Sequence, residues 1–133
     1  MLLDELSLEE KKAFWNIANV LASVDGRAVE EESILNQYKD EMGVDFEFVD
    51  ASLVDVKNEL VSISASSLRS RKIVYFELFG VAYADTEFDD KEKAVLDEVC
   101  AGLELPADVR DVLECSVKSI YDTYRKLDEV LNA

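Results

Sequence analysis

Histidine is absent from this 133-residue chain, and proline, glycine and cysteine are scarce, with one, four and two residues respectively. Without histidine, neither a Cys/His zinc site nor a histidine-based catalytic triad can form. Few prolines and glycines leave few breaks in the chain, and the many Leu, Ala, Glu, Lys and Val residues favour helices joined by short turns. The composition therefore predicts an all-α protein without a Cys/His zinc site or a histidine-based catalytic triad.

Segments for export or membrane insertion are also missing from the sequence. The N-terminal stretch "MLLDELSLEEKK" lacks a basic region followed by a long apolar core, so no signal peptide is expected. The longest apolar run, residues 73–84, contains Glu77 and is shorter than the roughly 20 residues of a membrane span. Cys100 and Cys115 fall on apolar stripes of separate predicted helices, which predicts reduced, half-buried thiols. We expect a cytoplasmic protein with no membrane insertion.

Positively charged side chains are also scarce relative to negatively charged ones. The chain carries 14 basic and 30 acidic side chains, a formal net charge of −16. Such a chain repels nucleic acid and anionic membrane surfaces, so neither is an expected partner. The expected partners are cations and basic protein patches. Divalent cations are also expected to relieve the self-repulsion of the folded state. The length and the 49% of hydrophobic residues suit a single folded domain over residues 1–133.

Apolar residues spaced three and four apart predict helices along most of the chain. Ser7 and Glu10 form a capping box for a first helix that ends near Ser23. Further helices are predicted over 29–42, 51–63, 68–84 and 89–102, with an irregular segment at 44–50. A last helix follows Pro106 with a long apolar stripe: Val109, Val112, Leu113, Val117, Ile120, Tyr124, Leu127 and Leu131. Short connections predict a compact bundle of about six or seven helices with antiparallel neighbours.

A repeat appears when the chain is shifted by 60 residues. The stretch "LASVDGRAVEEESIL" from Leu21 aligns with "VAYADTEFDDKEKAV" from Val81. In both copies an apolar helix ends at an aspartate, a short turn follows, and a glutamate lies seven residues beyond that aspartate. The repeat predicts two related loop–helix units, over about residues 14–42 and 74–102.

These units resemble the TerB-like family, which is named for a tellurite-resistance protein and also occurs as the N-terminal part of a membrane-anchored J-domain co-chaperone. The family pattern is A-x-x-D-G, then a hydrophobic residue, then Glu seven positions after the Asp. The matching residues here are Ala22, Asp25, Gly26 and Glu32, and again Ala82, Asp85, Phe88 and Glu92. Thr86 replaces the second glycine. The resemblance spans about residues 10–131 and implies a compact helical domain with a shared acidic region.

The acidic residues of the two units are candidate ligands for Ca²⁺ or Mg²⁺, which prefer several carboxylate oxygens. The spacing is not that of an EF-hand, because Asp90 and Leu96 stand where such a loop needs glycine and a bidentate glutamate. A site could form where the two loops meet. The candidate ligands are Asp25, Glu32, Asp85, Glu87, Asp89 and Glu92.

A purely structural interpretation explains part of the same pattern. Asp89 at the N-cap and Glu92 three residues later form a second capping box, and acids in a first turn favour the helix dipole. Elsewhere, the aromatic residues in helical apolar runs are predicted to lie in the core: Trp15, Tyr75, Phe76, Phe79 and Tyr83. Glu77, in the longest apolar run, is predicted to point outward or to meet Arg69 or Lys72.

Three functional hypotheses follow from these patterns. The first is a non-enzymatic binding domain in a stress or metal-response complex, whose acidic loops hold a divalent cation or dock a basic partner. The second is an interaction module that binds a protein through an apolar helical groove, with the acids serving only as helix caps. The third and most distant is a carboxylate-metal hydrolase. Because no nucleophile–base pair accompanies the carboxylates, no catalytic residue is predicted.

Overall fold

The computed structural model describes residues 2–24, 29–84 and 89–133, without the side chains of residues 29–32. These ranges contain α-helices and two short 3-10 helices (η) but no strand, as the composition predicts. In chain order the elements are η1 (Leu3–Glu5), α1 (Leu8–Ser23), α2 (Val29–Met42), η2 (Ala51–Leu53), α3 (Val56–Ser62), α4 (Leu68–Tyr83), α5 (Asp90–Gly102) and α6 (Ala107–Leu131).

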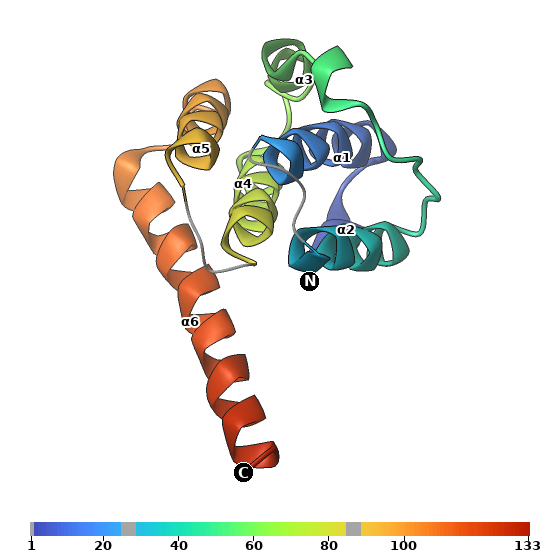
Figure 1. The fold of residues 1–133 in the computed structure, drawn as a ribbon. Helices are drawn as coiled ribbons and strands as arrows, with labels where there is room; N and C mark the ends of the chain where they lie inside the picture. Colours follow the sequence, from blue (N-terminus) through green and yellow to red (C-terminus); the bar gives the residue numbers. More distant parts are fainter. Residues whose placement is uncertain (1, 25–28, 85–88) are drawn as a thin grey trace.

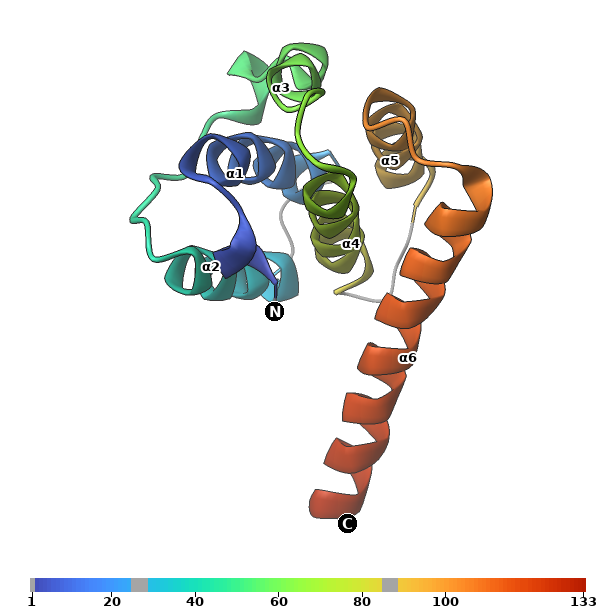
Figure 2. The ribbon, with the colours of Figure 1, turned by 180° about the vertical axis from the view of Figure 1, so that it is seen from behind.

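Helices α1 and α4 lie side by side at the centre of the molecule (Figure 1). Helices α2 and α3 pack on α1, and helices α5 and α6 pack on α4. Figure 2, the view from behind, shows the same order, with α6 at the edge of the bundle. The two related units of the sequence correspond to α1–α2 and α4–α5, so the equivalent helices α1 and α4 form the shared core.

Side-chain caps set most helix starts at the predicted positions. The Ser7 hydroxyl accepts a hydrogen bond from the Glu10 amide at 3.2 Å, and Glu10 Oε1 accepts one from the Ser7 amide at 2.8 Å. This confirms the capping box, which satisfies two of the amides that a helix start leaves without partners. Gly43 ends α2 with a φ of +69°, a conformation that glycine adopts without steric cost.

The predicted helix over residues 51–63 is wrong as a single element. The chain forms η2, leaves helical geometry at Val54, and starts α3 after Asp55. The Asp55 carboxylate accepts hydrogen bonds from the Lys57 and Asn58 amides and so acts as a new N-cap. Leu53, an apolar residue of this predicted helix, is therefore largely exposed. A local cap overrides the apolar spacing here.

Trp15 is the core residue of α1 that packs against segment 44–50. Its ring is buried, stacks on Phe46 at 5.9 Å between centroids and lies 5.5 Å from Phe48. The indole N–H donates to the Glu47 carbonyl at 2.8 Å. These contacts fix the irregular segment 44–50 without any strand, and they confirm the prediction that Trp15 is a core residue.

The N-terminal segment is part of the bundle, which the sequence analysis missed. Leu3 and Leu6 are buried, and the Leu2 amide donates to Glu77 Oε1 at 3.1 Å. Glu77 is thus buried rather than pointing outward, and it pairs with neither Arg69 nor Lys72. Arg69 instead binds Glu5 of η1 through hydrogen bonds of 2.8–3.0 Å. The segment before the first predicted helix supplies partners that helical periodicity cannot reveal.

The two thiols differ, contrary to the expectation that both are half-buried. Cys100 is buried and donates a hydrogen bond to the Leu105 carbonyl at 3.5 Å, and burial raises the pKa of its thiol. Cys115 is exposed on α6, away from the stripe that faces α4. Neither cysteine forms a disulfide. A buried thiol with a raised pKa is a poor nucleophile, because little of it is thiolate.

Three cations of α6 lie over three aromatic rings of α4. Arg110 lies 5.6 Å from the Tyr75 centroid, Lys118 lies 5.9 Å from Phe79, and Arg125 lies 5.8 Å from Tyr83. The first ring of α4 contacts the first cation of α6, the second ring the second cation, and the third ring the third. The two helices α4 and α6 therefore run in the same direction. The two helices are not consecutive, because α5 lies between them and carries the chain back, so this parallel pair does not test the antiparallel packing expected of consecutive helices.

The predicted apolar stripe of α6 is buried only in its middle. Val117 is buried and Leu113 is partly buried against the core. Four residues of the predicted stripe are exposed: Val112, Tyr124, Leu127 and Leu131. The C-terminal part of α6 is exposed because α6 has 25 residues, whereas α4, the helix on which it packs, has only 16.

Within the ranges that the structure describes, no helix is both long enough and apolar enough to cross a membrane.

Candidate functional site

Most of the predicted acidic ligands fall outside the described part of the chain. Asp25, Asp85 and Glu87 lie in segments 25–28 and 85–88, outside the described residues. Glu32 lies on α2, and its side chain is also outside the description. Asp89 and Glu92 are the two predicted ligands with described side chains. Among described residues, no group of three or more metal-ligating side chains comes together.

Asp89 and Glu92 have different environments at the start of α5. Asp89 is the N-cap, and its Oδ1 accepts a hydrogen bond from the Glu92 amide at 2.9 Å, which confirms the predicted capping role. The Glu92 side chain is only 3% exposed. Glutamates are rarely this buried, because removing a carboxylate from water is costly. The hydrogen bond to the Glu92 amide accounts for Asp89 as the helix cap.

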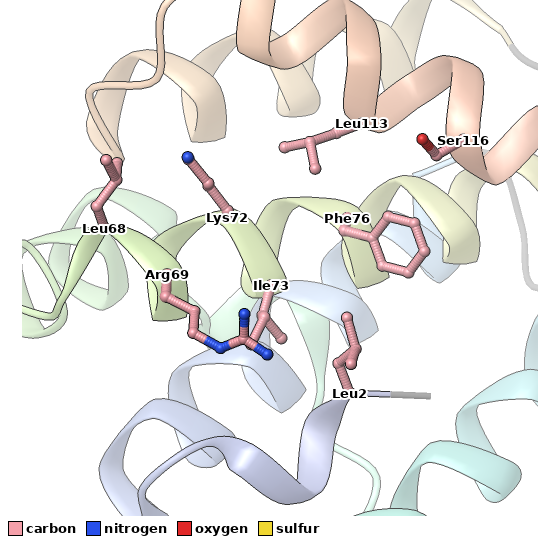
Figure 3. A pocket seen from close by; sticks show the side chains of 8 residues that line it. All are labelled: Leu2, Leu68, Arg69, Lys72, Ile73, Phe76, Leu113 and Ser116. Atoms are coloured by element: carbon pink, nitrogen blue, oxygen red, sulfur yellow. The ribbon is translucent and has the colours of Figure 1, made fainter.

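A second candidate site is an open groove of about 390 Å³ between η1, α4 and α6, which we call the Phe76 groove. Figure 3 shows Leu2, Ile73 and Phe76 close together where the N-terminal segment passes α4, with Leu113 projecting from α6. Apolar side chains therefore make most of the surface. The complete lining is Leu2, Leu68, Arg69, Lys72, Ile73, Phe76, Leu113 and Ser116.

The rim of the Phe76 groove is positively charged in a strongly acidic chain. Arg69 is neutralised by the bidentate contact with Glu5 described above. Lys72, one turn along α4, has no carboxylate within 4.0 Å among the described side chains. An apolar surface beside an uncompensated ammonium group suits an apolar ligand with an acidic side chain.

A cavity of about 360 Å³ lies on the other side of Phe76, between α2, α4 and α6, and we call it the Tyr38 cavity. The Tyr38 hydroxyl donates to the Glu77 carbonyl and the Tyr121 hydroxyl to the Gly80 carbonyl, both at 3.3 Å. A Cβ atom on Gly80 would lie 2.9 Å from the Tyr38 oxygen, so glycine permits this close approach. Other lining residues are Ile34, Gln37, Val117, Ile120 and Tyr124.

Glu77 places a carboxyl group in the wall of this cavity. The residue is 3% exposed, and burial raises the pKa of its carboxyl group above the usual 4.5, although the Leu2 amide opposes the shift. Burial, with the Glu77 charge as a smaller cause, raises the pKa of Tyr121 to about 12, so Tyr121 remains a neutral hydrogen-bond donor at neutral pH. Both shifts follow from removing a charged form from water.

Glu77→Gln is expected to raise the melting temperature at pH 7 and to leave it nearly unchanged near pH 4. A carboxyl group with a raised folded-state pKa stabilises the fold most when protonated. That contribution is lost as the pH rises from about 4.5 through the folded-state pKa. Glutamine imitates the protonated form at every pH. Thermal unfolding across this pH range measures the difference between variant and wild type.

Glu9→Gln is the matched control for this prediction, because Glu9 is exposed on α1 and its loss changes the net charge equally. If the two variants behave alike at every pH, general charge repulsion rather than the burial of Glu77 controls the effect.

Comparison with known families identifies the chain. A family model described as tellurite resistance protein TerB matches residues 40–113, more than half of the 133 residues. The chain belongs to the TerB family. No curated protein matches it, and no solved structure does.

The TerB match covers one of the two related units. It runs from the end of α2 through α3, α4 and α5 into the start of α6, so it includes Asp89, Glu92 and most of the Phe76 groove. The first unit, with Asp25 and Glu32, and the groove residues Leu2 and Ser116 lie outside it. The sequence predicts Phe76 as a core residue and, in the second hypothesis, an apolar helical groove without assigned residues. Its lining cannot be read from the sequence, because Leu2 and Leu113 meet Phe76 only in the folded chain. The run of leucines at positions 2, 3 and 6 is the signal that could have indicated a packed N-terminus.

Proposed function

We propose that this TerB-family chain is a non-enzymatic, cytoplasmic protein-interaction domain whose Phe76 groove binds an amphipathic helix of a partner. The partner helix presents apolar side chains to Ile73, Phe76 and Leu113, and an acidic side chain to Lys72. The observation that carries the proposal is the open apolar groove beside a lysine without a carboxylate partner in the described structure. Grooves between helices are common sites for amphipathic helices.

The groove is prepared for such a ligand before binding. Ile73 is buried on α4, and Leu2 is fixed by its amide hydrogen bond to Glu77, so the floor is held by the core rather than by a loop. A preformed apolar floor lowers the ordering cost of binding. The single charge at Lys72 then selects orientation, because an ion pair beside an apolar contact favours one register of the bound helix.

Peptides selected for binding from a library of amphipathic helices are expected to carry an acidic residue beside their apolar face. Lys72→Glu should weaken their binding at least tenfold, because attraction becomes repulsion at the rim. Titration of isotope-labelled protein with one selected peptide should shift the amide signals of Ile73, Phe76 and Leu113. Isothermal titration calorimetry gives the affinity of each variant.

Lys57→Glu is the matched control, because Lys57 is exposed on α3, outside the groove lining, and undergoes the same charge change. Equal weakening by both variants would mean that overall charge governs binding. Peptide-induced shifts confined to other surfaces would show that the Phe76 groove is not the site.

A second candidate function is a divalent cation site, or a docking site for a basic partner, formed by the acids of the two related units in a stress or metal-response complex. The burial of the Glu92 carboxylate at the start of α5 favours it, since a bound cation offsets the cost of burying a negative charge. The proposed ligands are those of the sequence pattern: Asp25, Glu32, Asp85, Glu87, Asp89 and Glu92.

Millimolar Ca²⁺ or Mg²⁺ is expected to raise the melting temperature of EDTA-treated protein by several degrees, because a ligand that binds only the folded state stabilises it. Glu92→Gln should abolish the rise. Asp90→Asn, an exposed acid in the first turn of the same helix, should keep it. Monovalent salt at matched ionic strength corrects for screening of the −16 charge. A rise that monovalent salt reproduces, or that Glu92→Gln leaves intact, would exclude this site.

A further inference from the structure

The C-terminal part of α6 carries an apolar surface that no other described part of the chain covers. The exposed fractions are 63% for Tyr124, 50% for Leu127, 73% for Val130 and 72% for Leu131. Both Figure 1 and Figure 2 show this part of α6 extending away from the other helices. A contiguous apolar surface on a helix that leaves the body of the protein marks an interaction site.

The spacing of this surface is that of a coiled coil. From Leu113 to Leu131 the apolar positions alternate in steps of four and three residues: Leu113, Val117, Ile120, Tyr124, Leu127 and Leu131. A period of 3.5 residues keeps the seam facing one partner helix over its whole length. The first half of the seam packs on the body of the protein, where Val117 is buried. Because α4 ends at Tyr83, the second half continues without that support.

We infer that α6 of a second copy of this chain covers the exposed half of the seam in an antiparallel pair. Centring the pair between Tyr124 and Leu127 places Tyr124 against Leu127 of the partner subunit. The same register brings Leu131 of the partner subunit to Ile120, which lines the Tyr38 cavity. The two-fold axis repeats each contact, so one apolar seam satisfies both copies.

Charge favours a second copy over a basic or acidic partner. Residues 117–133 carry three basic side chains and three acidic ones, so this segment is neutral in a chain of net charge −16. The basic residues are Lys118, Arg125 and Lys126, and the acidic ones are Asp122, Asp128 and Glu129. A strongly charged partner gains nothing from a neutral segment. Antiparallel pairing also places the two acidic bodies at opposite ends of the joined helices, which limits their repulsion.

The expected dimer is weak and depends on concentration and salt. The exposed seam is about two heptads long, so it buries less than the roughly 1,200–2,000 Å² of a standard stable interface. Salt screens the electrostatic repulsion between two chains that each carry a net charge of −16, but it does not weaken the apolar contact. Association should therefore become stronger as the salt concentration rises. A contact driven by opposite charges would weaken instead. The inference is independent of ligand binding at the Phe76 groove.

Sedimentation equilibrium of the full chain tests the pair. Wild type should move from 15.0 kDa toward twice that mass as concentration rises to the submillimolar range, and further at higher salt. Leu127→Glu should remain at 15.0 kDa. Val112→Glu, which is on the same helix, 64% exposed and off the four–three spacing, should behave as wild type. Reducing buffer is needed because Cys115 is exposed on α6.

Wild-type protein that stays at the mass of one chain at every concentration and salt level would overturn the inference. Association that Leu127→Glu leaves unchanged, or that Val112→Glu removes equally, would also overturn it. In a Cys115→Ser background, Ile120→Cys should cross-link to Leu131→Cys when the two variants are mixed. Efficient cross-linking of Leu131→Cys to itself would mean a parallel pair and reject the antiparallel arrangement.

Discussion

Replacing Trp15 by alanine is expected to lower the free energy of unfolding by about 3–5 kcal/mol, the range for large aromatic residues removed from a core. The ring is almost completely buried and contacts both Phe46 and Phe48. The substitution removes those contacts and the indole hydrogen bond to the Glu47 carbonyl. Since domains are stable by only about 5–15 kcal/mol, the variant should be marginal at physiological temperature. Urea unfolding followed by far-ultraviolet circular dichroism measures the loss.

Trp15→Phe separates the two contributions. Phenylalanine retains an aromatic ring for Phe46 and Phe48 but cannot donate to the Glu47 carbonyl, so we expect a loss of about 1–3 kcal/mol. Proteolysis should cut segment 44–50 faster in both variants, because Trp15 fixes this segment. Equal losses for Trp15→Phe and Trp15→Ala would show that the ring contacts contribute nothing, contrary to the packing.

Arg110→Met is expected to cost about 2–3 kcal/mol, because it breaks a partly buried charge network between α4, α5 and α6. The guanidinium binds Asp97 of α5 at 2.7 Å and Glu114 of α6 at 2.8 Å, and it lies over the Tyr75 ring. Tyr75 donates its hydroxyl hydrogen bond to Glu114. Methionine keeps the apolar stem but leaves the Glu114 carboxylate with one donor fewer. The expected loss is below that of a fully buried pair, because Asp97 is half exposed.

Arg125→Met is the matched control on the same helix. Arg125 pairs with the exposed Asp122 at 3.3 Å and also lies over an aromatic ring, so its replacement should cost less than about 1 kcal/mol. The double variant Arg110→Met, Glu114→Gln should be more stable than the sum of the single losses predicts, because position 114 then carries no charge and only the half-exposed Asp97 loses its ion pair. Additive losses, or equal costs at Arg110 and Arg125, would contradict a coupled network.

The proposed activities use three separate parts of one fold. The Phe76 groove lies where η1, α4 and α6 meet, and the exposed seam lies on the free half of α6. The proposed cation site lies at the start of α5, where Glu92 is buried. Because α4 is central and carries Phe76, Arg69 and Lys72, changes at the groove can be tested without disturbing the α6 seam.

The sequence by itself determined the helical class, the family and most element boundaries. Ser7 and Glu10 cap α1 through local hydrogen bonds, and Gly43 ends α2 through its own backbone freedom. Such signals act within one turn of the helix, so they can be read before the fold is known. The repeated Asp and Glu spacing of the two units also indicated the family that the TerB match then showed. The capping role of Asp89 was equally local.

Only the tertiary structure decided which faces meet. The spacing of α6 predicted one stripe, but the length of α4 determined that Val117 is buried while Leu127 is half exposed. Glu77 is buried because the N-terminal segment crosses α4, and a partner 75 residues away in sequence leaves no periodic trace. The Phe76 groove likewise joins three segments distant in sequence. The periodicity of apolar residues specifies which face of each helix is apolar. Which residues of that face are buried depends on where the neighbouring helices begin and end.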